Sequence, residues 1–417
     1  MIFRLLGFLV AYGFSFYVIK KYGEDVYGYV ALGLTLFSIL VVFGKMGFDI
    51  HLTKKFSAHK DLNTGFSFYY LSAIIALLFS ITISGIFYFL AENVSTNFFN
   101  KPEFTQYLQW TVLSVPLWTI ILINSGVLRG VKKNGLFSFI NFFSRFFITI
   151  IVIICLASIG EVEGSFIMKS HFIAIVLIFI FSCSEIFRLK RENTIVKKAK
   201  NSRQYICESL PLMSSTYFYV LLLWSDKIIL GVFETEVNIG VYDIVSKIAV
   251  VITFTYEAIN SILAPKISTA FHKNDFQLLQ KNISFSVRIT FFTGVLIFLG
   301  IIIFHRLVLE FLGEVYLTGV YALFVLCLGK ILISIFGPVS DILQMTGHQK
   351  TYSRIMFLTL IINLVLNYFF ITSMGINGAA IATSLAFLVM FILCYIYIKR
   401  ELKINSFLIS NNNDKND

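Results

Sequence analysis

The sequence predicts an all-α integral membrane protein with about 12 transmembrane helices, arranged as two parallel six-helix halves. Three observations lead to this fold class: a series of long apolar segments, a one-sided distribution of Lys and Arg between them, and a repeat that relates the two halves of the chain. The composition agrees, because charged residues make up 14% of the 417 residues, against about 25% in a soluble domain. Mean hydropathy is +0.82.

Twelve apolar segments define the predicted spans, and most have roughly the 20 residues that a hydrocarbon layer of ~30 Å requires. The first resembles a signal peptide in carrying Arg4 before its apolar run. No small-residue cleavage site follows it and eleven similar segments do, so we expect a transmembrane helix there. The segments cover residues 2–19, 26–44, 69–91, 105–128, 136–157, 165–187, 208–231, 238–264, 283–304, 317–346, 351–373 and 377–398.

Lys and Arg lie mainly in alternate connections, which predicts the orientation. Of the 34 basic residues, 24 fall in six segments that the spans place on one side of the membrane. The opposite side holds only Lys20, Lys21, Lys101 and Arg306. Short connections rich in Lys and Arg stay in the cytoplasm, so both termini are expected there. The net charge of +11 then reflects topology, and no nucleic-acid partner is expected. The basic segments are 45–68, 129–135, 188–207, 265–288, 347–354 and the tail from residue 399.

The connections are too short to fold as separate domains, which limits the classes of function. No GxxxxGK[ST] nucleotide-binding motif occurs, the six histidines are isolated, and the five cysteines fit no zinc or redox spacing. No outer connection carries the cluster of His, Arg or acidic residues that a sugar polymerase or transferase would need. We therefore expect a protein that is not an enzyme and that binds no cofactor or metal.

The two halves of the chain repeat each other in order. The segment KKYGEDVYGYVA at 20–31 corresponds to GVFETEVNIGVY at 231–242, and in both an acidic turn precedes a Gly-aromatic entry into a span. An even number of spans per half makes the repeats parallel, and transporters place their site between such halves. The predicted organisation is a six-helix bundle over 1–187, a basic cytoplasmic connector over 188–207, a second six-helix bundle over 208–398 and a polar cytoplasmic tail over 399–417.

Three stretches resemble the polysaccharide-exporting branch of the multidrug/oligosaccharidyl-lipid/polysaccharide superfamily. Residues 20–58 look like the opening of that branch, 209–248 carry Pro211, Asp226 and Gly240-x-Tyr242, and 363–386 read NLVLNYFFITSMGINGAAIATSLA. The resemblance covers nearly the whole chain and is greatest to the O-antigen flippases. One departure is that the family has a short polar lead before the first span, whereas this chain begins within that span.

This resemblance implies a V-shaped, MATE-like pair of six-helix bundles. The implied cargo is an undecaprenyl-pyrophosphate-linked O-antigen or other polysaccharide repeat unit, moved from the cytoplasmic to the outer leaflet of the bacterial inner membrane, as in lipopolysaccharide biosynthesis. Other implied partners are H⁺ or Na⁺, membrane lipids, and the polysaccharide polymerase and chain-length machinery. Three alternatives stay open: a cation-coupled multidrug antiporter of the same fold, a lipid II flippase (a branch with two further C-terminal helices) and a membrane-bound polysaccharide polymerase.

Ionisable side chains inside the predicted spans are the candidate site residues, because a charge at bilayer depth is costly unless it meets a cavity or a partner. Several recur with polar residues at helical spacing, which predicts one polar face on each of the spans 136–157, 238–264 and 317–346. Such faces also join neighbouring helices, and Asp243 and Lys247 have the i, i+4 spacing of an ion pair. The candidates for binding pyrophosphate and sugar are Arg145, Lys330, Lys247 and Arg4.

The carboxylates in the spans are the candidates for ion coupling. Since the chain has no nucleotide motif, transport must draw on an ion gradient or on the membrane potential, where one charge crossing 100 mV corresponds to about 2.3 kcal/mol. Asp341 is the first choice, because it is predicted to share a helical face with Lys330 and follows the Gly337–Pro338 break, where backbone carbonyls are free to help hold a cation. The full set is Asp341, Glu257, Asp226 and Asp243.

Overall fold

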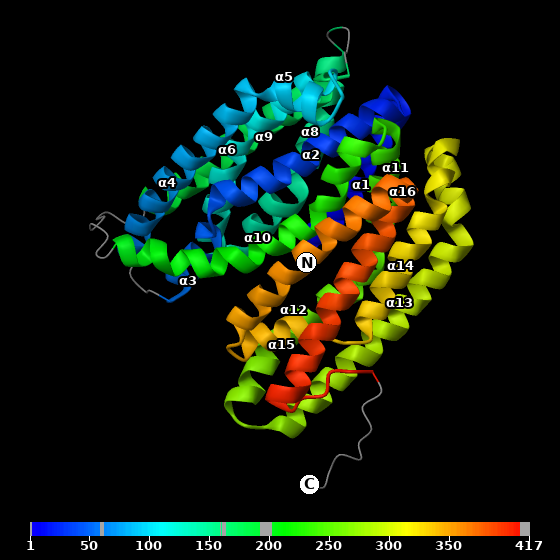
Figure 1. Ribbon diagram of the computed structural model, residues 1–417. Coiled ribbons are helices and arrows are strands. Elements are labelled where there is room, and N and C mark those ends of the chain that lie inside the picture. The colour runs from blue at the N-terminus through cyan, green and yellow to red at the C-terminus, as the bar shows by residue number, and fades with distance from the viewer. Residues whose placement is uncertain (1, 59–61, 159, 161–163, 192–201, 409–417) are drawn as a thin grey trace. The chain divides into compact units, whose positions relative to one another are not determined.

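The chain is helical throughout the part that the structure describes. This is a computed structural model that describes residues 2–58, 62–158, 160, 164–191 and 202–408, and within these ranges it contains no β-strand (Figure 1). The chain divides into two compact units, Met1–Val220 and Leu221–Asp417. Half of the predicted basic connector, residues 192–201, and the end of the tail, 409–417, lie outside the described residues.

The first unit is organised around one buried helix, α6 (Phe104–Gly130), which packs against α2, α3, α4 and α9. Its burial on several sides explains why it carries small and hydroxylated residues among its apolar ones, since these let neighbouring backbones approach. The other elements are α1 (Ile2–Tyr22), α2 (Glu24–Lys45), α3 (Phe48–Ala58), α4 (Leu62–Phe89), α5 (Ala91–Asn93), η1 (Val94–Phe98), α7 (Asn134–Ser138), η2 (Phe139–Ser144), α8 (Arg145–Ala157), α9 (Phe166–Arg191) and the first part of α10 (Ser202–Phe233).

In the second unit α14 packs against α16 and α11, and α12 packs against α13. The long helix α16 is two helices joined at Gly375, whose φ of 58° and ψ of −133° are open to glycine and strained for other residues. This break lies between the predicted spans 351–373 and 377–398. The elements after α10 are α11 (Glu236–Val250), η3 (Val251–Thr253), α12 (Phe254–His272), α13 (Phe276–Leu312), η4 (Glu314–Gly319), α14 (Val320–Ser334), α15 (Val339–Met345), α16 (Gln349–Tyr397) and η5 (Ile398–Leu402).

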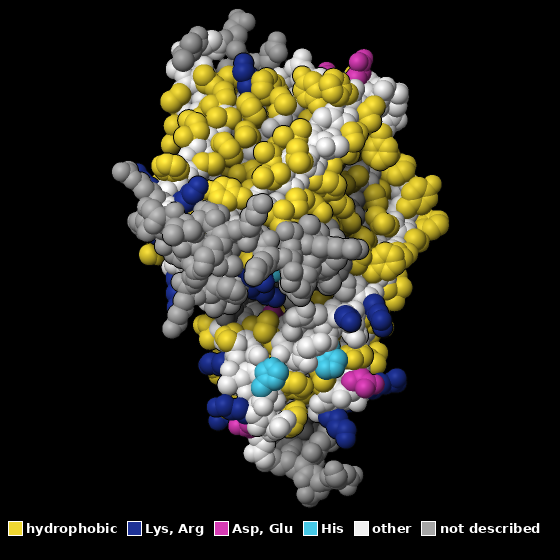
Figure 2. Space-filling view, turned by 90° about the vertical axis from the view of Figure 1, so that its left-hand side faces the viewer, with side chains coloured by type: hydrophobic (Ala, Val, Ile, Leu, Met, Phe, Trp, Pro, Cys, Tyr) yellow, Lys and Arg dark blue, Asp and Glu magenta, His cyan; other side chains and the backbone are white. Residues whose placement is uncertain are grey.

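The surface has the character of a membrane protein, as the composition predicts. Ten helices in the described ranges are long and apolar enough to cross a bilayer. Figure 2 shows a face broadly covered by hydrophobic side chains, with Lys, Arg and His gathered toward its lower end. On α13 the large apolar side chains that are 65–71% exposed recur at helical spacing, so this face of the helix is suited to lipid. They are Phe285, Phe292, Leu296, Ile303, Leu307 and Phe311.

The structure corrects two predicted spans and one predicted connection. The span 238–264 is divided by the 3₁₀ turn η3, and the span 317–346 is divided between Ser334 and Val339, where Gly337 has a φ of 73° and Pro338 follows it. The prediction that Lys330 and Asp341 share one helical face is therefore wrong, because the two residues belong to different helices. The predicted connection 45–68 contains the helix α3.

Candidate functional site

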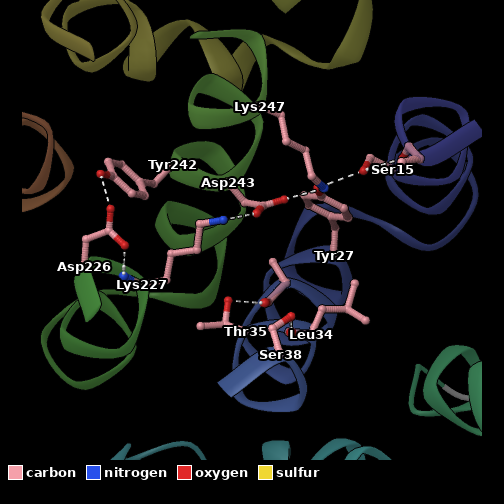
Figure 3. A network of polar contacts seen from close by, with 12 residues as sticks. Ser15, Tyr27, Leu34, Thr35, Ser38, Asp226, Lys227, Tyr242, Asp243 and Lys247 are labelled. Carbon is pink, nitrogen blue, oxygen red and sulfur yellow. Dashed lines mark hydrogen bonds and ion pairs between the residues drawn. The ribbon is translucent and has the colours of Figure 1, made fainter. Parts of the chain in front are cut away.

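A tight turn brings four ionisable or polar side chains of the second unit together. Helix α10 ends at Phe233 and α11 begins at Glu236, where the Thr235 hydroxyl accepts a hydrogen bond from the backbone N–H of Asn238 at 3.3 Å. The pairs Asp226–Lys227 and Tyr242–Asp243 lie on either side of this turn, and Asp226 is 16 residues from Tyr242, as Lys227 is from Asp243. Figure 3 shows their side chains pointing toward one another from the two helices.

Asp226 is a buried carboxylate with three donors. The Tyr242 hydroxyl donates to Oδ2 at 2.6 Å, the Thr383 hydroxyl donates to the same oxygen at 3.3 Å, and the backbone N–H of Lys227 donates to Oδ1 at 2.7 Å. The residue is only 4% exposed. Hydrogen bonds to an ionised carboxylate are strong, so these donors hold the side chain in one orientation.

Two buried amides on α16 extend this polar cluster. The Ser225 hydroxyl donates to Asn363 Oδ1 at 2.5 Å, and Asn367 lies one helical turn further along the same face. Within the described residues, Asn363 Nδ2 and both side-chain polar atoms of Asn367 have no hydrogen-bond partner, although both residues are fully buried. Burying an amide without a partner is unfavourable, so these groups are suited to binding a small polar or ionic ligand. The cluster of Asp226, Tyr242, Asn363, Asn367 and Thr383 is called the Asp226 cluster below.

Asp243 lies between two lysines. Its Oδ1 is 2.5 Å from Lys227 Nζ and its Oδ2 is 2.7 Å from Lys247 Nζ (Figure 3). The predicted i, i+4 pair of Asp243 with Lys247 is confirmed. The Lys227 side chain is 6% exposed and its ammonium also lies over the Trp224 ring at 4.5 Å, whereas the Lys247 side chain is 27% exposed. Asp243 therefore serves as the counterion of both lysines and links helices α10 and α11.

The remaining candidates of the second unit are more scattered. Lys330 on α14 is partly buried, and Glu257 and Asp226 are close enough for their charges to act on it. Glu257 lies exposed on α12. Asp341, on the short helix α15, has no hydrogen bond or ion pair to another described residue. Asp341 thus has no polar partner within the described ranges.

In the first unit, Arg145 faces aromatic rings. Its guanidinium carbon lies 4.3 Å from the ring centroid of Phe146, 5.5 Å from that of Phe37 and 5.7 Å from that of Trp118. It forms no ion pair with a carboxylate of the described residues. Cation–π contacts of this kind stabilise a guanidinium without neutralising it. Arg145 therefore keeps a positive charge that an anionic ligand can meet.

Arg4 has a different environment from the other basic candidates. It is exposed near the start of α1, and its guanidinium lies 4.8 Å from the Phe142 ring centroid. The aromatic contact anchors the side chain at the helix surface.

Two residues of interest were missed by the sequence reasoning. Lys227 is one of six basic residues in predicted spans, and its position beside Asp226 in an otherwise apolar segment is a signal that could have identified it. His171 on α9 is fully buried, but an isolated histidine in an apolar run gives no sequence signal of its own.

Comparisons with known proteins agree with this architecture. Residues 1–271 match the family model described as polysaccharide biosynthesis protein. A probable low-salt glycan biosynthesis flippase, Agl15 of Haloferax volcanii, is 29% identical over 212 residues, which are 48% of this chain and 43% of that protein's length. An uncharacterized membrane protein of Methanocaldococcus jannaschii is 22% identical over 94% of this chain and 95% of its own length.

Solved structures of two membrane transport proteins share this fold. An inward-facing multidrug resistance MATE family transporter of the MOP superfamily superposes with a TM-score of 0.80 at 14% identity, covering 95% of this chain and 94% of that one. The lipid II flippase MurJ in an inward closed conformation gives a TM-score of 0.75 at 16% identity, covering 95% and 86%. These matches confirm the predicted MATE-like fold. The chain therefore belongs to the polysaccharide biosynthesis protein family.

Proposed function

We propose that this protein moves a polyprenyl-diphosphate-linked oligosaccharide, with undecaprenyl as the expected lipid, from the cytoplasmic to the outer leaflet of the cell membrane. The observation that supports this most strongly is Arg145, a partly buried guanidinium inside an apolar helix, surrounded by three aromatic rings and without a carboxylate partner among the described residues. A guanidinium fork matches phosphate oxygens, and aromatic rings stack on sugars. Lys330, Lys247 and Arg4 are proposed as further contacts for the anionic cargo.

We place the coupling ion, H⁺ or Na⁺, at the Asp226 cluster. The cluster offers one buried carboxylate, the hydroxyls of Tyr242 and Thr383, and the side-chain oxygen of Asn367, and oxygen donors of this kind suit a hard cation. Asp243 is a weaker candidate than the sequence indicates, because two lysines already occupy its oxygens. Glu257 on α12 and Asp341 on α15 remain candidates. The two units would then be the two six-helix bundles that the repeat predicts.

Flipping by the purified protein tests this function directly. Proteoliposomes that contain a fluorescent lipid-linked oligosaccharide should show protein-dependent flipping when an ion gradient is imposed, without ATP. Arg145→Ala should lower the initial rate at least tenfold, because a hydrogen bond to a charged group contributes about 1.5–3 kcal/mol. Lys350→Ala, on the exposed first turn of α16, is the matched control and should flip at the wild-type rate.

Two results would contradict the proposal. Equal flipping rates in protein-containing and protein-free vesicles would show that the protein does not transport the lipid-linked oligosaccharide. Gradient-driven accumulation of an organic cation with no movement of the lipid would favour the multidrug antiporter instead.

The proposed orientation is tested separately by cysteine labelling. In a variant without its native cysteines, Asn97→Cys on η1 should react in intact cells with a membrane-impermeant maleimide, and Lys350→Cys should react only after the cells are opened. The expectation follows from the excess of Lys and Arg in the segments assigned to the cytoplasm. Labelling of the cysteine at position 350 in intact cells would reverse the orientation and place both termini outside.

A further inference from the structure

His171 is a fully buried polar side chain close to the candidate residue Arg145. It lies on α9 in the first unit with 0% exposure, and within the described part of the chain neither Nδ1 nor Nε2 has a hydrogen-bond partner. A neutral imidazole carries one N–H donor and one acceptor nitrogen, so both capacities are unused. Unsatisfied buried polar groups are rare in native structures, and each requires a physical explanation.

The position of His171 relates it to Arg145. The imidazole packs edge-on against the Phe37 ring with 5.2 Å between ring centroids, and the Arg145 guanidinium lies 5.5 Å from the centroid of that same ring. Arg145 is also close enough for its charge to act on His171. Helices α2, α8 and α9 thus bring an arginine and a histidine to one phenylalanine.

Local backbone geometry positions Arg145 in this cluster. The residue directly follows the π-helical turn η2, Phe139–Ser144, and a π turn adds a residue to the helix and rotates everything after it. Trp118, on α6, follows the in-helix Pro116 by two residues and supplies a second aromatic wall. Such irregularities are frequent at functional sites.

We propose that Arg145 and His171 together bind one phosphoryl group of the cargo, with Phe37 and Trp118 as the walls of the site. This rests on the proposed function and deepens it, because it assigns the diphosphate of the lipid-linked glycan to the first unit. Arg145 supplies the positive charge, and the imidazole of His171 supplies an N–H donor. The cluster favours an anion because no described carboxylate forms an ion pair with Arg145.

Replacing His171 by Phe separates this role from a purely structural one. Phe keeps the aromatic packing on Phe37 and removes two buried polar atoms without partners, so the thermal midpoint of the full-length protein in lipid nanodiscs should stay level or rise. Binding of inorganic diphosphate, measured by calorimetry, should nevertheless weaken about tenfold, the loss expected for one hydrogen bond to a charged group. Arg145→Ala should weaken binding further.

The diphosphate-binding test includes a control, His305→Phe, and a second variant, His171→Leu. His305→Phe removes a histidine of the second unit whose Nδ1 lies 2.7 Å from the Ile302 carbonyl, and it should leave diphosphate affinity unchanged. If His171→Phe does not fold, His171→Leu is measured in its place, with the same expectation. Unchanged affinity in a folded His171 variant would overturn the proposal and identify a core histidine satisfied by water.

A lipid-linked diphosphate and free diphosphate share this chemistry, and flipping assays distinguish them. Parallel loss of diphosphate binding and of lipid-linked glycan flipping in His171→Phe supports the site as part of the transport path. A second outcome is that His171→Phe loses diphosphate binding while the wild-type protein itself flips no lipid-linked glycan. This result would support the anion site and refute the proposed flippase function. The two failures are therefore distinguishable.

Discussion

Replacement of Asp243 by Ala is expected to destabilise the protein more than any other single change in the polar network of the second unit. Asp243 is 4% exposed and is the counterion of both Lys227 and Lys247. Removing it leaves the Lys227 ammonium buried without a counterion, and breaking a buried ion pair in this way costs about 3–5 kcal/mol. Thermal unfolding of the detergent-solubilised protein should show a lowered midpoint, and yield from membranes should fall.

Companion variants distinguish a buried charge from a simple packing defect. Combining Asp243→Ala with Lys227→Met removes both the counterion and the charge it serves, so a large part of the lost stability should return. Lys247→Ala should cost about 1 kcal/mol or less, because its side chain is 27% exposed and partly hydrated. If Asp243→Ala and Lys247→Ala destabilise the protein equally, and the double variant restores no stability, the Lys227 ammonium does not need Asp243 as its counterion.

The features that local rules control were predictable from the sequence. Span lengths follow from bilayer thickness, so helices occupy the predicted apolar segments, although 238–264 and 317–346 are each divided. The Asp243–Lys247 pair follows from the i, i+4 geometry of a single helix. The break at Gly375 falls between two predicted spans, and its combination of φ 58° with ψ −133° favours a residue without a side chain.

The features that depend on tertiary packing were not predictable. Lys227 reaches Asp243 from another helix, and only the position of the turn after Phe233 makes the two residues neighbours. The division of the span 317–346 was signalled by Gly337–Pro338, but hydropathy alone continues through that segment. His171 is recognisable only by what surrounds it, because burial and missing partners are properties of the folded chain.

Asp226→Asn and Asp341→Asn should separate the two carboxylates that compete for the coupling role. Asp226 has the hydroxyls of Tyr242 and Thr383 on one of its oxygens, and buried amides with unused polar atoms lie on the neighbouring face of α16. Asn is nearly isosteric with Asp and keeps most of these contacts, but it cannot hold a cation by charge or take up a proton. Flipping by Asp226→Asn should therefore lose its response to the ion gradient, a drop of at least tenfold in the driven rate.

The same variant should still bind the cargo, since Arg145 and the first unit are unchanged. Asp341 lies on a seven-residue helix and has no polar partner among the described side chains, so Asp341→Asn should retain gradient-driven flipping within about twofold. Flipping rates with and without the gradient, and calorimetric binding of inorganic diphosphate, are measured for both variants. The opposite pattern, with Asp226→Asn still driven and Asp341→Asn not, would transfer the coupling role to the segment after Pro338. There, Gly337 interrupts the helix and leaves backbone carbonyls free to take part in holding an ion.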